Sequence, residues 1–468
     1  MKHGRARKGG AGPEPANQSN QIGETHLKHL LASLACGVAL AATADAQLSN
    51  YLGPGILTGG ADNIGNRSGE QVDLRLYASV TGIYDNGIEP VSVNSKGDLV
   101  QVSGLYGIDT SVGAYGVHSW RVAQLGLNYS GDFIHFTNDS AYDMSNQSLR
   151  LGYTYQKSRR LYFDLQGTGG TYSIALGAIA GEASATPSII NQQSLLLFDN
   201  RTYFLQAGAG MTYLLTPRAS ISVGGEGFTV QYQSSALVGM EGYGAHANFR
   251  YRVSRLTSIG AQYARQHFQY PNFFGQSDMN LYTALFSTQI GRLWTLSANA
   301  GAYQVNSVGL QSVALAPAIA ALLGVSSTVH IFASQTWIPA GQANLTRRFK
   351  NANAFASYSR TVLPGNGVYL TSRSEQGVVG YSYSGLRKAT FSMSGGYISL
   401  ASLGQGIPPY RMFTAGAGIT YNLTHALHAV ARYDVRQQEI TIAGYRATAF
   451  RATLGIAFSP GTLPLSLW

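Results

Sequence analysis

The sequence has little charge for its length. Asp, Glu, Lys and Arg make up 12% of the 468 residues, whereas a soluble globular domain carries about 25%. There is also only one cysteine, Cys36, and it lies in a segment that we expect to be removed. The mature chain would then have no disulfide and no thiolate metal site. The composition therefore disfavours a large soluble helical enzyme and a disulfide-stapled fold.

Long apolar runs are also missing, with one exception. Residues 30–42 read LLASLACGVALAA, a run too short to cross a bilayer as a helix. It follows Lys28 and leads into Ala44-Asp45-Ala46, an A-x-A cleavage pattern. Together these features predict a secretory signal peptide over residues 1–46, cleaved after Ala46. We expect residues 47–70 to form a short periplasmic segment and residues 71–468 to form one domain.

What is abundant is glycine (56 residues) and tyrosine (29 residues), in segments where apolar and polar residues alternate. In residues 243–253, one face carries Tyr243, Ala245, Ala247, Phe249, Tyr251 and Val253, and the other carries Gly244, His246, Asn248, Arg250 and Arg252. Residues 294–303 and 413–422 repeat this pattern. A period of two indicates β-strands with one apolar face. Strands of this length are typical of membrane barrels, in which one face meets lipid and the other the lumen. A soluble β-sandwich is the alternative, but its polar face would be richer in Lys and Glu.

The turns between these segments alternate between short and long, and aromatic residues flank the short ones. Outer-membrane barrels show the same asymmetry, with short periplasmic turns and long extracellular loops. The sequence predicts about 18 strands, or 16 if the first pair is irregular, in an all-β, transmembrane antiparallel up-and-down barrel. We expect these strands near 71–84, 99–112, 119–133, 147–156, 160–171, 202–215, 219–232, 240–253, 257–268, 279–290, 293–304, 339–349, 352–362, 373–384, 387–398, 411–422, 426–436 and 447–458.

The last predicted strand carries a resemblance to a known class. Phe450, Ala452, Leu454, Ile456 and Phe458 share one face. This strand resembles the C-terminal signal that the barrel-assembly machinery reads in Gram-negative outer-membrane proteins. A tail over residues 459–468 departs from that pattern, so either Phe458 or Trp468 could be the terminal aromatic residue. Residues 70–468 resemble porin-like outer-membrane barrels, which implies an outer-membrane location and contact with outer-membrane lipid and the assembly machinery.

Charged residues at the inward parity of the predicted strands are candidates for lining the lumen. Our lumen-lining candidates are Arg75, Arg150, Arg250, Arg252, Arg373, Arg432, Asp434, Arg436 and Arg451, with Asp73, Asp164, Glu226 and Glu375 at the same parity. Because arginine predominates, these positions would favour anionic solutes. The alternative is an internal Arg–Asp/Glu network that braces the wall.

The predicted loop 306–338 is unusually apolar, with VALAPAIAALLG over residues 313–324. An apolar stretch of this length is poorly suited to free movement in water. We expect it to fold, partly as helix, into the lumen or over its mouth. Packing between other loops is the alternative.

The sequence predicts a porin-like channel for small hydrophilic solutes. The arginine candidates add the expectation that these solutes are anionic. Two alternatives remain: an export pore for an anionic exopolysaccharide, and a non-transporting barrel that acts as an adhesin or scaffold. We expect no enzyme activity, no cofactor, no metal and no nucleic-acid partner. His425 and His428 illustrate this, since residues three apart on a strand point to opposite faces. The oligomeric state is left open.

Overall fold

A computed structural model describes most of the predicted barrel. The described residues are 72–86, 92–93, 99–100, 104–138, 143–173, 201–233, 237–271, 273–314, 327–363, 370–403, 409–440, 445–459 and 462–463. The predicted signal peptide and the segment 47–70 lie outside these ranges. Among the residues described, no helix has the length and apolar character needed to cross a membrane.

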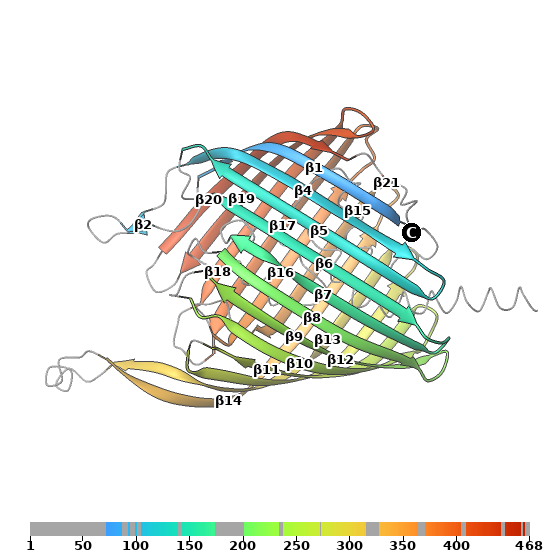
Figure 1. Cartoon of the computed structure of the whole chain (residues 1–468), viewed down its shortest axis with the longest axis vertical. Helices are drawn as coiled ribbons and strands as arrows, with labels where there is room; N and C mark the ends of the chain where they lie inside the picture. Colours follow the sequence, from blue (N-terminus) through green and yellow to red (C-terminus); the bar gives the residue numbers. More distant parts are fainter. Residues whose placement is uncertain are drawn as a thin grey trace, which may run out of the picture.

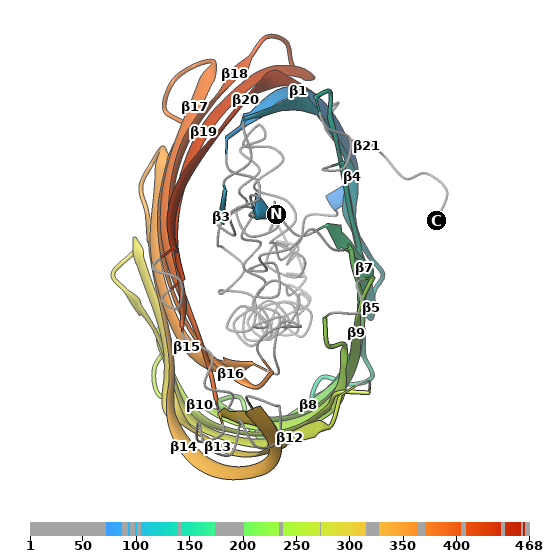
Figure 2. The same ribbon diagram turned by 90° about the vertical axis from the view of Figure 1, so that its left-hand side faces the viewer.

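The described part of the chain forms a closed antiparallel β-barrel, oval in cross-section (Figures 1 and 2). Its 18 wall strands are β1 (Val72–Asp85), β4 (Leu105–Ser119), β5 (Ala123–Phe136), β6 (Met144–Gln156), β7 (Leu161–Ser173), β8 (Arg201–Leu214), β9 (Ala219–Tyr232), β10 (Met240–Arg252), β11 (Thr257–Gln269), β12 (Gly275–Ile290), β13 (Trp294–Ala314), β14 (Ser327–Arg348), β15 (Ala352–Leu363), β16 (Ser372–Tyr383), β17 (Ala389–Ser402), β18 (Tyr410–Asn422), β19 (Leu427–Ile440) and β20 (Tyr445–Phe458). The predicted fold class and the count of 18 are confirmed.

Each wall strand pairs with its neighbours in sequence, and the ring closes between the first and last strands. Ala78 of β1 pairs with Phe458 of β20, while the other edge of β1 pairs with β4. The two-residue strand β21 (Thr462–Leu463) adds to β1. Beside the wall, β2 (Ser92–Val93) and β3 (Leu99–Val100) form a small separate sheet. The single strand predicted at 99–112 is therefore β3 and the start of β4. Closure satisfies the edge N–H and C=O groups that an open sheet would leave unpaired.

The two rims of the barrel differ. At one rim, which we call the short-turn rim, connections of three to five residues join β4–β5, β6–β7, β8–β9, β10–β11, β12–β13, β14–β15, β16–β17 and β18–β19. The opposite rim, which we call the long-loop rim, carries the remaining connections. Gly291, in the β12–β13 turn, has a φ of 64°, a left-handed conformation that glycine adopts without steric cost.

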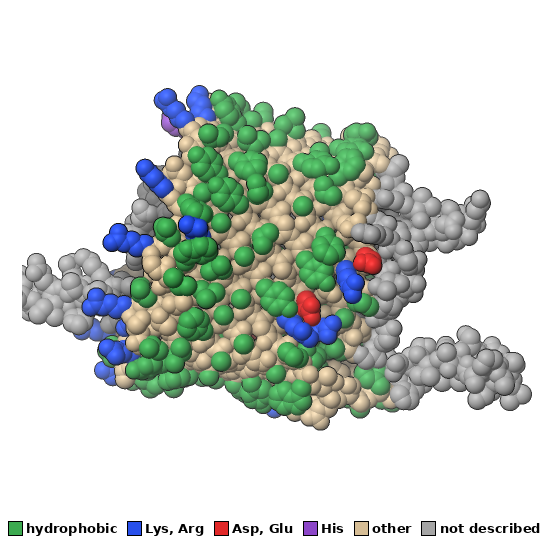
Figure 3. All heavy atoms as spheres, turned by 180° about the vertical axis from the view of Figure 1, so that it is seen from behind, with side chains coloured by type: hydrophobic (Ala, Val, Ile, Leu, Met, Phe, Trp, Pro, Cys, Tyr) green, Lys and Arg blue, Asp and Glu red, His purple; other side chains and the backbone are tan. Residues whose placement is uncertain are grey.

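The outer face of the wall is apolar. Leu454, Tyr243 and Leu205 are 69%, 65% and 59% exposed, although they lie within strands. Hydrophobic side chains are spread over the visible face of the barrel between its rims (Figure 3). Alternate residues point the other way, so that Arg250 lies on the face opposite Phe249 and Tyr251. This separation confirms the alternation expected from the sequence.

The prediction for residues 306–338 is wrong in its described parts. Residues 306–314 belong to β13 and residues 327–338 to β14, which pair along their whole length from Trp294↔Arg347 to Ala314↔Ser327. This hairpin projects beyond the long-loop rim, away from the lumen (Figure 1). Residues 315–326 lie outside the described residues. Strand pairing rather than helix satisfies the backbone here because β13 and β14 simply continue past the wall.

Candidate functional site on the inner wall

Small polar side chains that bond one another across neighbouring strands line much of the inner wall. The hydroxyls of Ser79 and Ser111 are 2.6 Å apart, and those of Ser277 and Ser307 are 2.8 Å apart. On β13 and β14, Asn299 donates to Gln342 over 3.3 Å. Directly opposed residues of an antiparallel pair lie on the same face, so these contacts form rows. The inner wall is hydrophilic without relying on charge.

Arginines and aspartates form a buried cluster on the inner faces of β1, β4, β19 and β20. Its members, which we call the arginine–aspartate cluster, are Asp85, Asp109, Arg432, Asp434, Arg436 and Arg451. The Arg432 guanidinium donates two hydrogen bonds of 2.5 Å to the Asp434 carboxylate, from Nε to Oδ2 and from Nη2 to Oδ1. Paired bonds of this kind are among the strongest that side chains form.

Two further ion pairs tie β19 and β20 to the start of the wall. Arg451 reaches Asp109 over 3.3 Å, and Arg436 lies 3.9 Å from Asp85. The Arg436 and Asp85 side chains are 5% and 1% exposed. Because burial of an isolated charge is unfavourable, each group depends on its partners. These pairs cross the seam where β1 meets β20, so the cluster braces the closure of the ring.

A glycine makes room for the central aspartate. A Cβ atom on Gly416 would overlap Oδ1 of Asp434. We expect Gly416→Ala to lower the unfolding free energy by about 2 kcal/mol, because the carboxylate must leave its arginine or the strand must shift. Denaturant titration of the barrel in phospholipid vesicles measures this.

Gly152 provides the matched control for that substitution. It also lies on the inner face, but a Cβ atom there meets nothing within 4 Å. Gly152→Ala should leave stability unchanged or raise it slightly, because the substitution reduces the freedom of the unfolded chain. Equal effects at the two glycines would contradict the assigned role of Gly416.

Carboxylates also occur across β7 and β9. Glu226 of β9 accepts bonds from Gln206 over 3.0 Å and from Gln266 over 3.4 Å. Asp164 of β7 lies beside Gly210, whose missing side chain leaves its carboxylate space. Both acids lie at the inward parity expected from the sequence. The predicted preference for anions was based on the arginines and gave no weight to these acids.

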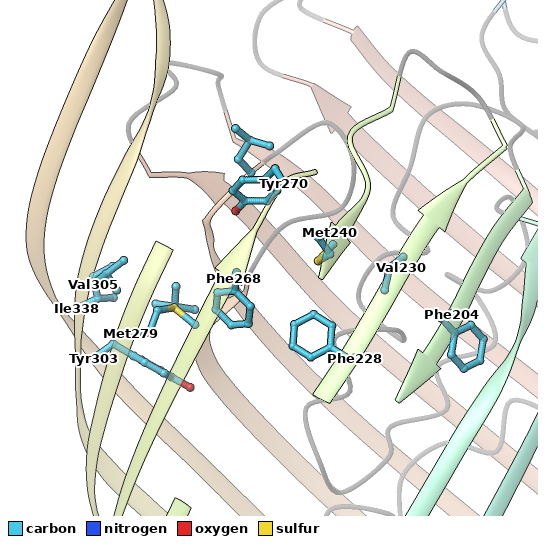
Figure 4. Close-up of a cluster of buried hydrophobic side chains, with 12 residues drawn as sticks. Phe204, Phe228, Val230, Met240, Phe268, Tyr270, Met279, Tyr303, Val305 and Ile338 are labelled. Atoms are coloured by element: carbon cyan, nitrogen blue, oxygen red, sulfur yellow. The ribbon is translucent and has the colours of Figure 1, made fainter. Parts of the chain in front are cut away.

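An apolar cluster lies near the long-loop rim, formed mainly by inward residues of β8 to β14 together with Val362 of β15 and Leu370 of the β15–β16 connection (Figure 4). It contains Phe204, Phe228, Val230, Met240, Phe268, Tyr270, Met279, Tyr303, Val305, Ile338, Val362 and Leu370. Phe268 is fully buried, and Met279 is 1% exposed. Sequence analysis missed this cluster. The signal was available, because inward positions near these strand ends carry Phe, Met or Val instead of Gly, Ser or Thr.

Tyr270 of this apolar cluster is hydrogen-bonded to Thr371 in the connection between β15 and β16. Tyr270 Oη and Thr371 Oγ1 are 3.1 Å apart, and burial raises the pKa of Tyr270 to about 12. The neutral phenol is therefore favoured in the folded barrel. Its contribution to stability is fully present below pH 10 and is lost as the pH rises through 12. We expect Tyr270→Phe to remove that part of the alkaline unfolding profile, measured by tryptophan fluorescence. An unaltered profile would contradict the role of this phenol.

The structure places most of the predicted lumen residues on the inner face. Strand parity puts the following there: Arg150, Arg250, Arg252, Arg432, Asp434, Arg436 and Arg451. Arg75 lies in β1, but its side chain is outside the described part of the chain. In those parts that the structure describes, no group of three or more His, Cys, Asp or Glu side chains could hold a metal ion.

The predicted position of Arg373 in the lumen needs correction, because the structure places this residue on the outer face of the wall. It lies on the same strand face as Val379, which is 57% exposed on the outside of the barrel, whereas Gln376 and Val378 face inward. Glu375 shares the outer face and lies 3.5 Å from both Arg360 and Arg373. At a strand end near the long-loop rim, charged side chains can pair on the outside because they lie beyond the apolar band. The inward parity predicted for the strand at 373–384 was therefore wrong.

Comparisons with known proteins yield only distant structural likeness. No model of a known protein family and no curated protein matches the chain in sequence. Among solved structures, Pseudomonas aeruginosa OpdQ is similar at a TM-score of 0.39 and 10% identity, over 84% of this chain and 98% of that one. The P. aeruginosa outer-membrane protein OpdK gives 0.41 and 13%, over 84% and 99%. The ferric citrate transporter FecA gives 0.39 and 11%, over 81% and 63%. Values this low assign neither a family nor a substrate.

Proposed function

We propose that this protein is an outer-membrane channel for the passive diffusion of small hydrophilic solutes. The observation that carries the proposal is the separation of faces around a closed ring: apolar side chains cover the outside of the 18 strands, and polar side chains line the inside. Exposed hydrophobic surface on this scale is unfavourable in water and favourable in hydrocarbon. A ring of this many strands encloses more space than its own side chains fill.

The inner charges support a channel with little preference between cations and anions. The described inner wall carries Arg150, Arg250, Arg252, Arg432, Arg436 and Arg451, together with Asp85, Asp109, Asp132, Asp164, Glu226 and Asp434. The numbers of arginine and acidic side chains on this described inner wall are equal. Because arginines of the arginine–aspartate cluster are paired with carboxylates, they add little net field to the lumen. The expectation of an anion-selective arginine lumen is therefore replaced by one of weak selectivity.

Conductance of the purified mature protein in planar lipid bilayers tests this function. We expect stepwise current increases and, in a salt gradient, a reversal potential close to zero. Absence of conductance from correctly folded barrels would contradict a channel and favour the scaffold alternative. Strong anion selectivity would contradict the balanced lumen and would return weight to an export pore for an anionic polymer.

A further inference from the structure

The short-turn rim carries cations in nearly every turn. The exposed basic residues there, which we call the basic rim, are Arg121, Lys157, Arg159, Arg160, Arg218, Arg255, Arg292, Arg348, Lys350, Arg387 and Lys388. None of the eight short turns contains Asp or Glu, and the one turn without Lys or Arg contains His425. Figure 3 shows the blue side chains along this edge of the barrel. In the described part of the chain, eleven Lys and Arg side chains are thus gathered at one end of the barrel.

The long-loop rim is different, because three of its outward arginines have acids beside them. Arg360 and Arg373 share Glu375, and Arg411 pairs in register with Glu439. His267 and Asp278 form a further pair at 3.0 Å. The basic rim therefore does not reflect a general excess of basic surface residues. It needs a counter-charge that the described chain does not supply in these turns.

Exposed apolar side chains accompany the cations. They are Trp120, Val122, Leu215, Val253, Leu256, Leu293, Phe349, Leu386 and Leu423, each at least 39% exposed. Every short turn except β6–β7 contains one of these residues, and the β6–β7 turn follows exposed Tyr155. Such apolar side chains would be unfavourable in turns that project into bulk water. Alternating cations and apolar groups suit the boundary between lipid tails and headgroups.

Arg347 shows which side of the wall such a cation occupies. It lies at the end of β14, and its guanidinium carbon is 4.8 Å from the Trp294 ring centre and 4.4 Å from that of Phe349. Trp294 and Arg347 are directly paired across the strands, so they share the outer face with Leu345. The rings hold this cation over the lipid-facing surface rather than the lumen.

In four of the eight short turns, a side-chain hydroxyl satisfies backbone amide donors. The hydroxyls of Ser158, Thr216, Ser254 and Thr424 each accept bonds from two amide N–H groups at their turns. This repeated arrangement takes up amides that could otherwise bind an anion. The Lys and Arg side chains of the basic rim are therefore the groups best placed to bind one.

We propose that the basic rim binds the phosphate headgroups of anionic phospholipids in the adjoining membrane leaflet. The proposal rests on the membrane location assigned under the proposed function. Charge complementarity selects an anionic headgroup, and the apolar neighbours select a lipid over a soluble anion or an acidic polymer. Cationic side chains near a membrane surface enrich anionic lipid in just this way.

Two native tryptophans report on the lipid at this rim. Trp120 lies in the β4–β5 turn and Trp294 directly follows the β12–β13 turn, whereas Trp337 lies midway along β14, away from this rim. In a Trp337→Phe, Trp468→Phe background, the full mature barrel is reconstituted in phosphatidylcholine vesicles. A minor fraction of bromine-labelled lipid, either phosphatidylglycerol or phosphatidylcholine, is added at equal mole fraction. We expect about threefold stronger quenching by brominated phosphatidylglycerol, with loss of the difference at high salt.

A pair of variants separates the rim from general electrostatics. Lys157→Gln, Arg159→Gln and Arg160→Gln together, with Arg387→Gln and Lys388→Gln added in a second variant, should reduce the preference stepwise. The control is Arg201→Gln, Arg265→Gln and Arg411→Gln, three exposed arginines toward the long-loop rim, which should retain it.

Each outcome has a distinct meaning. Equal quenching by the two lipids would overturn the headgroup proposal while leaving the membrane barrel intact. If equal quenching were accompanied by co-sedimentation of the barrel with peptidoglycan, the headgroup proposal would also be overturned. The basic rim would then be assigned to binding a cell-wall polymer. Lack of quenching by either lipid would contradict the membrane location itself, and with it the proposed function.

Discussion

Asp434→Ala should lower the unfolding free energy of the barrel by about 3 kcal/mol. The substitution leaves the Arg432 guanidinium, whose side chain is 12% exposed, without the carboxylate that binds it through two 2.5 Å bonds. Removing one member of a buried ion pair is more damaging than removing both, because the remaining charge stays desolvated. Denaturant-induced unfolding in vesicles and the heat-induced mobility shift on gels would both register the change.

The double variant Arg432→Met, Asp434→Leu is the control for this prediction. It removes both charges and keeps side-chain volume on the inner wall. We expect it to recover most of the lost stability, since hydrophobic replacements of buried pairs are often neutral. If the double variant were as unstable as Asp434→Ala, the loss would come from packing rather than from an uncompensated charge.

Leu151→Arg should be similarly harmful, at about 3 kcal/mol, because it places a charge on the outer face near the middle of β6. Leu151 is 43% exposed in the barrel. In a bilayer that exposed surface meets hydrocarbon, where arginine is strongly disfavoured. Folding efficiency and stability in phosphatidylcholine vesicles measure the effect, and the variant should be less impaired in detergents with short, deformable micelles.

The next residue tests the same strand from the other side. Gly152→Arg puts the same side chain on the inner face, where a Cβ atom meets nothing within 4 Å. We expect a change in stability below about 1 kcal/mol, together with a shift of ion selectivity toward anions in the bilayer recordings. Equal damage at residues 151 and 152 would contradict the assignment of inner and outer faces.

The strands of the wall were predictable because the requirement for an apolar, lipid-facing side chain repeats at every second residue. The pattern over residues 243–253 matches β10, Met240–Arg252, to within three residues at either end. The last strand, predicted at 447–458, spans Tyr445–Phe458. Lipid imposes an apolar face and water a polar one, so period two is written into each strand wherever both solvents are present.

Prediction failed where the outer face is no longer purely apolar or the inner face no longer polar. β13 was predicted to end at residue 304, yet Val305 continues it and faces inward within the apolar cluster. An apolar inner face near the long-loop rim erases the alternation. Arg373 was assigned to the lumen by the parity predicted for the strand at 373–384, although its strand neighbours place it outside beside Glu375. The Arg432–Asp434 geometry also could not be predicted, because residues two apart on one strand face can pair with each other or with a neighbouring strand.

The seam between β1 and β20 has a consequence for how this polypeptide reaches its native state. Ala78 must find Phe458, so the contact that completes the circle joins nearly the whole span of the chain. Until the final strand is available, every partial cylinder has two open edges, each able to join another molecule. Correct folding therefore requires that both open edges stay unpaired with other molecules until β1 and β20 meet, and any truncation that removes β20 leaves a sheet that cannot close by its native pairing.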